Sequence, residues 1–156
     1  MGSKRSQRVL ILCTGNSARS QMAEGLLRHD GGDVFAVESA GFEPGFVRPE
    51  AIEAMRELGI DISGQHSKSL DKFIGQLFDY VITVCDNANQ NCPVFPGAKG
   101  RIHWSVEDPA VVSGTHETRM KAFRDARDDL RRRLGKFIES AKAVGASRQR
   151  RRPGPL

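Results

Sequence analysis

Cysteine and aromatic residues are scarce in this chain of 156 residues, which holds three cysteines, one tryptophan and one tyrosine. An odd number of thiols (Cys13, Cys85 and Cys92) without a C-x2-C pair argues against both a permanent disulfide framework and a zinc site. Long apolar runs are absent too, since none approaches the roughly 20 residues that cross a bilayer. The run at residues 9–13 is shorter than the apolar part of a secretion signal. We therefore expect a cytoplasmic protein without a membrane partner.

An excess of charge of one sign is also missing from the middle of the chain. The formal net charge is +5, yet residues 148–156 alone hold four arginines and no acid. We expect a flexible N-terminus over residues 1–7, a single catalytic domain over residues 8–143 and a basic disordered tail over residues 144–156. The middle of the chain is near neutral and has no basic face, so we expect no nucleic-acid partner; we also expect a monomer. A basic-tailed nucleic-acid-binding protein is the most distant alternative.

The order of strand-like and helix-like segments indicates an α/β fold. Short apolar or alternating runs predict strands at residues 9–12, 34–39, 80–85 and 101–104. Apolar residues at helical spacing predict helices at residues 17–29, 49–58, 71–77 and 116–142, and residues 86–100 are expected to form a loop. This alternation predicts a four-stranded parallel sheet with helices on both faces, in which ligands bind at the carboxyl ends of the strands. Cys13 and Cys85 both stand at such ends.

The turn after the first strand is suited to holding an oxyanion. It consists of Cys13, Thr14, Gly15, Asn16, Ser17, Ala18 and Arg19. Gly15 and Asn16 tolerate the left-handed backbone of a tight turn, and the following helix directs unpaired N–H groups at it, which favours a bound anion. The guanidinium of Arg19 adds a fork of donors for two oxygens of that anion. The same positive field is expected to lower the pKa of the Cys13 thiol and make it a nucleophile.

Several motifs of the chain resemble one enzyme family. The C-x5-R-S pattern in the first strand–helix turn is similar to that of the low molecular weight tyrosine phosphatases. The longer segment "CTGNSARSQMAEG" resembles their relatives, the thioredoxin-coupled arsenate reductases, as do "VCDNANQNCP" (residues 84–93) and "HWSVEDPA" (residues 103–110). The resemblance implies a low molecular weight phosphatase-like fold and an enzyme that reduces arsenate to arsenite.

The resemblance also implies a relay of thiols. Cys13 would attack arsenate held by residues 14–19, with Asp108 protonating the leaving oxygen and Ser20 hydrogen-bonding the Cys13 sulfur. Cys85 would then attack Cys13 and release arsenite. Cys92 would attack Cys85 and leave a Cys85–Cys92 redox disulfide for thioredoxin to reduce. Glutaredoxin or a small thiol is the alternative reductant.

The segment between Cys85 and Cys92 must change shape for this last step. In a helix, seven rises of about 1.5 Å would separate the two Cα atoms by about 10 Å, whereas a disulfide permits at most about 7 Å. The segment contains poor helix formers, and a proline follows it (Asp86, Asn87, Asn89, Asn91, Pro93). We therefore expect it to be mobile when reduced and reshaped when oxidised.

Two positions depart from the family pattern. Ala18 stands where many relatives carry a second cysteine of the loop, which the relay does not use. No tightly bound cofactor is expected, but some relatives bind a potassium ion. The matching positions here would be Asn16, Glu24, Ser39, Ser67 and Ser69. The last replaces an aspartate, so the resemblance implies at most a weak potassium site and no other metal.

A low molecular weight protein tyrosine phosphatase that uses Cys13, Arg19 and Asp108 is the alternative within the same fold. Such an enzyme would have no need of Cys85 or Cys92. The residues after Asp108-Pro109 are an alanine and a valine, not the tyrosines common in that family. The histidines, His66 and His103 among them, receive no role from the sequence.

Overall fold

A four-stranded parallel sheet forms the centre of the protein, whose computed structural model describes residues 6–150, with side chains to residue 143. The strands are β1 (Gln7–Cys13), β2 (Phe35–Gly41), β3 (Tyr80–Thr83) and β4 (Gly100–His103). Their order is β2-β1-β3-β4, so β1 and β3 are central. The β1 residues Val9 and Leu12, and the two between them, are fully buried, as expected for a strand covered on both faces. The predicted four-stranded parallel sheet is confirmed.

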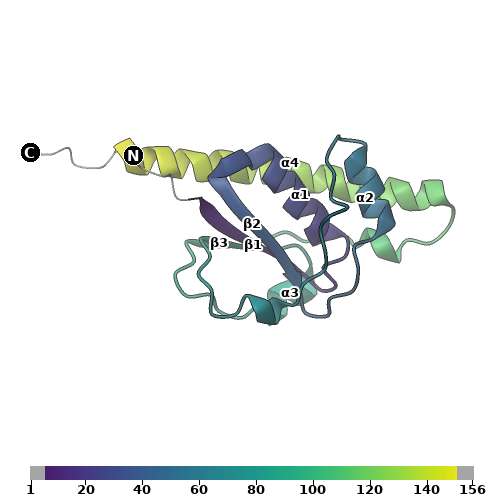
Figure 1. The fold of residues 1–156 in the computed structure, drawn as a ribbon, viewed down its shortest axis with the longest axis horizontal. Helices are drawn as coiled ribbons and strands as arrows, with labels where there is room; N and C mark the ends of the chain where they lie inside the picture. Colours follow the sequence, from purple (N-terminus) through teal and green to yellow (C-terminus); the bar gives the residue numbers. More distant parts are fainter. Residues whose placement is uncertain (1–5, 151–156) are drawn as a thin grey trace, which may run out of the picture.

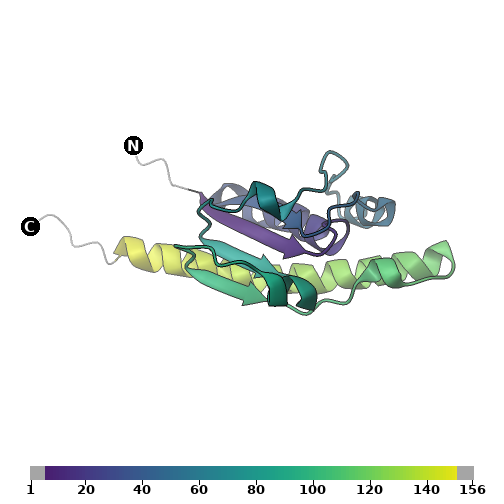
Figure 2. The same ribbon diagram turned by 90° about the horizontal axis from the view of Figure 1, so that it is seen from below.

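Helices α1 (Arg19–Gly31), α2 (Pro49–Arg56) and α4 (His116–Arg150) pack against one another, and Figures 1 and 2 show α4 running along the sheet. Phe137 of α4 contacts Phe35 of β2 and Tyr80 of β3, with ring centroids 5.6 and 5.0 Å away. These contacts place α4 on the face of the sheet that carries Phe35 and Tyr80. The Tyr80–Phe137 pair is edge-to-face and the Phe35–Phe137 pair is tilted, and aromatic pairs of this kind add to the burial energy of the core.

The opposite face of the sheet is covered by the segment that leads into β3, residues 70–78, which includes the 3-10 helix η2 (Leu70–Lys72). The guanidinium of Arg8, in β1, lies 4.3 Å from the ring centroid of Phe78. Phe78 packs edge-on against Phe73 and Phe95, at 6.0 and 5.9 Å. Both faces of β1 are thus closed to water, so a ligand-binding site can lie only at an end of the sheet, and the carboxyl end is where parallel sheets bind ligands.

Two sequence predictions in this part of the chain are wrong. The helix expected over residues 71–77 is only η2, because the chain turns at Gly75, whose φ is 88°, and leaves Ile74 and Leu77 more than half exposed. The loop expected over residues 86–100 begins with a helix, α3 (Asp86–Asn91). The Sγ atom of Cys85 caps α3 by accepting the N–H of Ala88 at 3.3 Å, and Ala88 is buried against the core.

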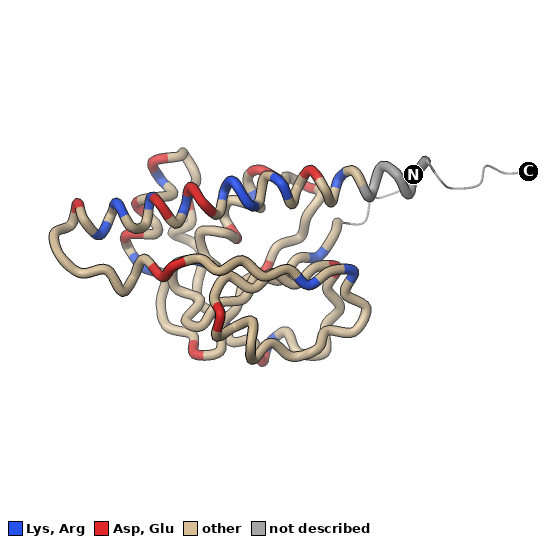
Figure 3. The backbone as a smooth tube through the Cα atoms, turned by 180° about the vertical axis from the view of Figure 1, so that it is seen from behind, with Lys and Arg blue, Asp and Glu red and all other residues tan. Residues whose placement is uncertain are grey.

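Helix α4 is longer than expected. It continues to Arg150, beyond residue 143, where the domain was expected to end. Residues 144–150 are therefore helical, and the remainder of the expected tail, like residues 1–5, lies outside the described residues. Basic and acidic residues alternate along α4 (Figure 3), where ion pairs such as Lys121–Asp125 and Arg133–Asp129 join them. In residues 6–150, no helix is long and apolar enough to cross a membrane.

Candidate active site

The turn between β1 and α1, residues 14–18, is held open by the chain that follows β2. The carbonyl oxygens of Thr14 and Ser17 accept the N–H groups of Glu43 and Arg48, both at 2.9 Å, and the carbonyl between them, at position 15, accepts a third. Asn16 adopts the left-handed conformation, with a φ of 48°, which asparagine tolerates better than most residues. With these carbonyls bonded outward, the N–H groups of the turn remain for a ligand.

Those N–H groups form the anion cradle that the sequence predicts. Among the described residues, none of the backbone N–H groups of residues 15–18 donates a hydrogen bond to the protein. The first turn of α1 follows directly, and the residue before it, Ala18, offers no side-chain cap. Uncapped N–H groups and the helix dipole both favour negative charge at this place.

Arg19 adds a positive charge to the cradle. Its side chain is nearly buried, and its Nη1 donates to the carbonyl oxygen of Val106 at 2.8 Å. Its Nη2 lies 3.6 Å from Oδ2 of Asp108. The Nε atom is buried and has no partner among the described residues, which is costly for a charged donor. An oxyanion seated in the turn would supply the missing acceptor.

Asp108 lies beside Arg19, where the sequence prediction needs an acid. It precedes the 3-10 helix η3 (Pro109–Val111), and its Oδ1 accepts the N–H of Ala110 at 3.0 Å. The other carboxylate oxygen faces the guanidinium of Arg19. About a third of the Asp108 side chain is exposed, so this carboxyl group can exchange protons with water at the mouth of the cradle.

Cys13 and Cys85 meet at the base of the cradle, at the carboxyl ends of β1 and β3, and both are buried. Their thiols hydrogen-bond each other, and Cys85 Sγ lies 3.4 Å from the Thr14 hydroxyl oxygen. The hydrogen bond from Cys13, followed by those from Thr14 and Ala88, lowers the pKa of Cys85 to about 5. The same Cys13–Cys85 bond, together with burial, raises the pKa of Cys13, although the charge of Arg19 opposes this.

The two pKa shifts belong to the pair of thiols, and because adjacent buried thiolates repel each other, the pair shares at most one negative charge. The sequence prediction of a lowered pKa for Cys13 is not met in this arrangement, because the hydrogen bond with Cys85 and burial raise that pKa. What the sequence could not reveal is how closely the second thiol approaches the first.

Cys92 is separated from this pair by α3. It follows the last residue of that helix and is half-buried. Its thiol donates to the carbonyl oxygen of Pro93 at 3.4 Å. Burial raises its pKa, and the nearby charge of Arg101 partly offsets this effect. The structure thus brings together two of the three predicted thiols and places the third at the far end of a short helix.

Two side chains of β4, which the sequence did not single out, tie α3 in place. His103 Nε2 lies 2.9 Å from Oδ1 of Asp86, and its Nδ1 lies 2.8 Å from the hydroxyl of Thr83. Arg101 Nη2 donates to the carbonyl oxygen of Asn89. These contacts join residues from separate strands and a helix, so no local pattern in the sequence could have indicated them.

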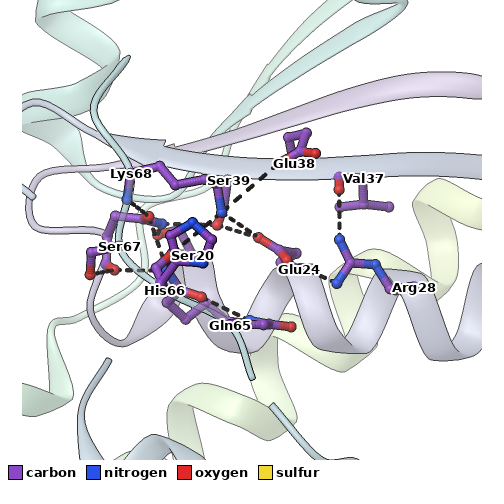
Figure 4. A network of polar contacts seen from close by, with 12 residues as sticks. Ser20, Glu24, Arg28, Val37, Glu38, Ser39, Gln65, His66, Ser67 and Lys68 are labelled. Carbon is purple, nitrogen blue, oxygen red and sulfur yellow. Dashed lines mark hydrogen bonds and ion pairs between the residues drawn. The ribbon is translucent and has the colours of Figure 1, made fainter. Parts of the chain in front are cut away.

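A buried polar network lies beneath the turn, and Figure 4 shows it from close by. The Asn16 side chain donates to the hydroxyls of Ser20 and Ser39, at 2.8 and 2.9 Å. The Ser39 hydroxyl in turn donates to Oε1 of Glu24 at 2.6 Å. Ser20 was expected to bond the Cys13 sulfur, but its partner among the described residues is Asn16. Ser20 therefore supports the backbone of the turn in this structure.

Comparisons with known proteins agree with this geometry. The family model described as low molecular weight phosphotyrosine protein phosphatase matches residues 8–150. The arsenate reductase of Halalkalibacterium halodurans is 46% identical over 134 residues, which are 86% of this chain and 96% of that protein. The solved structure of an arsenate reductase in the phosphate binding state is 35% identical, with a TM-score of 0.76, over 86% of this chain and 98% of that one.

A thioredoxin-dependent arsenate reductase of Corynebacterium glutamicum is also similar in structure. It is 29% identical with a TM-score of 0.67, over 90% of this chain and 65% of that one. The match to the family model, over residues 8–150, includes every residue predicted for the site.

Proposed function

The chain belongs to the low molecular weight phosphotyrosine protein phosphatase family, and we propose that within it the protein is an arsenate reductase coupled to thioredoxin. The observation that carries this proposal is the buried thiol pair, Cys13 and Cys85, at the base of the anion cradle. A phosphatase needs one nucleophilic thiol, whereas a reductase must take two electrons from sulfur. The reductases similar to this chain support the assignment.

In the first step, Cys13 forms a bond to arsenic. The oxyanion sits on the N–H groups of residues 15–18 and on Arg19, whose buried Nε then gains an acceptor. The thiolate of Cys13 attacks As(V), a bond between arsenic and oxygen breaks, and the carboxyl group of Asp108 protonates the leaving oxygen, which departs as water. The positive field of the cradle stabilises the charge that develops on the oxygens.

In the second step, Cys85 reduces the arsenic. The Cys85 thiolate attacks the Cys13 sulfur, a disulfide forms between them, and the electron pair of the sulfur–arsenic bond stays on arsenic, which leaves as arsenite. With Cys13 bonded to arsenic, the hydrogen bonds from Thr14 and Ala88 and the charge of Arg19 still lower the pKa of Cys85 and favour the thiolate form that such exchange requires.

In the third step, Cys92 relieves the active-site disulfide. Its thiolate attacks Cys85, and Cys13 leaves as a thiolate, ready for another oxyanion. Cys92 follows the last residue of α3 and is only half-buried. A Cys85–Cys92 disulfide would therefore lie outside the cradle, where a reductant can reach it. Two electrons from thioredoxin then restore both thiols.

The same cradle supports a second candidate function, hydrolysis of a phosphate monoester by Cys13, Arg19 and Asp108. Its favouring observation is the ion-pair distance of 3.6 Å between Arg19 and Asp108, which places an acid at the mouth of an oxyanion site. In that reaction Cys85 and Cys92 would be spectators.

The test is arsenate-dependent oxidation of NADPH in the presence of thioredoxin and thioredoxin reductase. It should be measured on the wild type and on Cys13→Ser, Cys85→Ser and Cys92→Ser, beside hydrolysis of p-nitrophenyl phosphate. We expect each of the three substitutions to abolish reductase turnover. Phosphatase turnover should be lost only with Cys13→Ser. Full arsenate reduction by Cys85→Ser or by Cys92→Ser would refute the relay, and absence of arsenate reduction by the wild type would leave the phosphatase assignment.

A further inference from the structure

Lys68 is a buried lysine beneath the active-site turn, and its ammonium group lies in the polar network of Figure 4. Its Nζ is 3.4 Å from Oε1 of Glu24, 3.4 Å from the carbonyl oxygen of His66 and 3.9 Å from Oε2 of Glu38. We propose that this ammonium group is the built-in cation of the network and takes the place that a potassium ion has in some relatives. Lys68 is then a positioning residue of the oxyanion site, whichever oxyanion the site accepts.

A positive charge is needed at this place because Glu24 is buried. The carboxylate belongs to α1, and only 3% of the residue is exposed. A carboxylate removed from water is stable only when it is paired and hydrogen-bonded. Its Oε2 pairs with Arg28 at 2.9 Å, and its Oε1 accepts the Ser39 hydroxyl and faces the ammonium group of Lys68. Both oxygens are thereby satisfied by groups of the protein.

The residues suggested by the resemblance do not fit a potassium site. The side-chain oxygen of Asn16 already accepts two N–H groups, from the Gln21 side chain and from the Lys68 backbone, each at 2.9 Å. The hydroxyl of Ser69, expected as a ligand, accepts the N–H of Asp71 and caps η2. A potassium ion on Glu24 would lie against the charge of Lys68, and two buried cations repel each other.

The network connects Lys68 to the turn that binds the oxyanion. Glu24 orients the hydroxyl of Ser39, Ser39 accepts the side-chain N–H of Asn16 at 2.9 Å, and Asn16 is the left-handed residue of the turn. The backbone N–H of Lys68 holds the other end of the same Asn16 side chain. Loss of the ammonium group would leave Glu24 without half of its charge compensation, and the strain would reach the turn through Ser39.

The inference predicts that the wild-type protein has no preference for potassium. The thermal midpoint and the affinity for inorganic phosphate should be measured in KCl and in NaCl at equal ionic strength. Phosphate binding does not depend on reductase turnover, so this test is separate from that of the proposed function. We expect equal values in the two salts. A midpoint or a phosphate affinity that rises in KCl alone would overturn the inference without the need for any variant.

Substitution tests the role of the charge. Lys68→Ala is expected to lower the thermal midpoint by about 10 °C, because it leaves a buried carboxylate short of a partner. It should also weaken phosphate binding by about tenfold, the lower end of the loss seen when residues that support metal ligands are removed. KCl should restore more of the thermal midpoint and of the phosphate affinity than NaCl does. Lys68→Arg, which retains the charge, should keep phosphate binding within about twofold of wild type. The exposed Lys72→Ala is the control in the same segment. Unchanged phosphate affinity in a folded Lys68→Ala protein would overturn the inference.

Discussion

In the proposed relay, helix α3 must unwind before Cys92 can reach Cys85, and the contacts of His103 oppose this change. The two cysteines flank the six residues of α3, and helical rises put their Cα atoms about 10 Å apart, beyond the reach of a disulfide. The imidazole of His103 binds Asp86 at the start of α3 and is itself held by Thr83. We predict that His103→Ala accelerates the transfer of the disulfide from Cys13–Cys85 to Cys85–Cys92.

The size of the effect follows from the exposure of this pair. The Asp86 side chain is 69% exposed and that of His103 is 27% exposed. Ion pairs between side chains this open to water are weak. The transfer should therefore become only about two to five times faster. Arg101→Ala is a poorer probe, because removing that charge would also raise the pKa of Cys92.

The assay is a single turnover with arsenate in the absence of thioredoxin, quenched by acid at successive times. Peptide mapping then counts the Cys13–Cys85 and Cys85–Cys92 disulfides. His116→Ala is the matched control, because His116, at the start of α4, is an exposed histidine that also pairs with a carboxylate, that of Glu53 in α2. Equal or slower transfer in His103→Ala, with the control unchanged, would refute the idea that the β4 contact holds α3 closed.

Three further predictions concern the cradle and its thiols. Gly41→Ala should lower the free energy of unfolding in urea by about 1–3 kcal/mol, because its Cβ would stand 2.6 Å from a carbonyl oxygen of the turn. Gly45→Ala is the control and should leave that free energy unchanged, because a Cβ at this position would meet open space. Arg19→Lys should weaken phosphate binding about 10- to 100-fold in calorimetry, since an ammonium group lacks the planar fork. Cys85→Ala should lower the pKa of Cys13, because it removes the hydrogen bond that raises this pKa. Alkylation of Cys13 by iodoacetamide near neutral pH should then become about tenfold faster for each unit by which the pKa falls. Slower alkylation would contradict the shared-proton description.

The parts of the fold that depend on residues close together in the sequence were predictable from it. The anion cradle is one continuous segment, and its chemistry follows from Gly15, Asn16 and Arg19 in their order along the chain. Helix α4 carries buried residues such as Phe123, Leu130 and Leu134 at helical spacing, which is a strong local signal. The meeting of Cys13 and Cys85 followed from the rule that parallel strands end at one edge of a sheet.

Other features depend on contacts between distant segments. Helix α3 has poor helix formers, and it is held by the Cys85 cap and by β4 contacts that no local pattern contains. At the positions expected to bind potassium, a difference of one residue along the chain decides which side chain faces Glu24. Ser69 forms a bridge with Gly41, and neighbouring residues of an extended chain point to opposite sides. Lys68 therefore faces Glu24, and Ser69 faces away to cap η2.

In the proposed relay, the thiol pair explains how one site can perform both a phosphatase-like attack and a reduction. Two thiolates side by side in a buried site would repel each other, so the pair holds a single negative charge. With the cradle free of substrate, the hydrogen bond between the two sulfurs favours the charge on Cys85 and the proton on Cys13. Transfer of the proton along the hydrogen bond between them makes Cys13 the nucleophile for the oxyanion. Once Cys13 is bonded to arsenic, its own charge is gone, and Cys85 regains a low pKa from Thr14, Ala88 and the charge of Arg19. The order of the two attacks is therefore set by which sulfur can bear the one charge that the cradle stabilises.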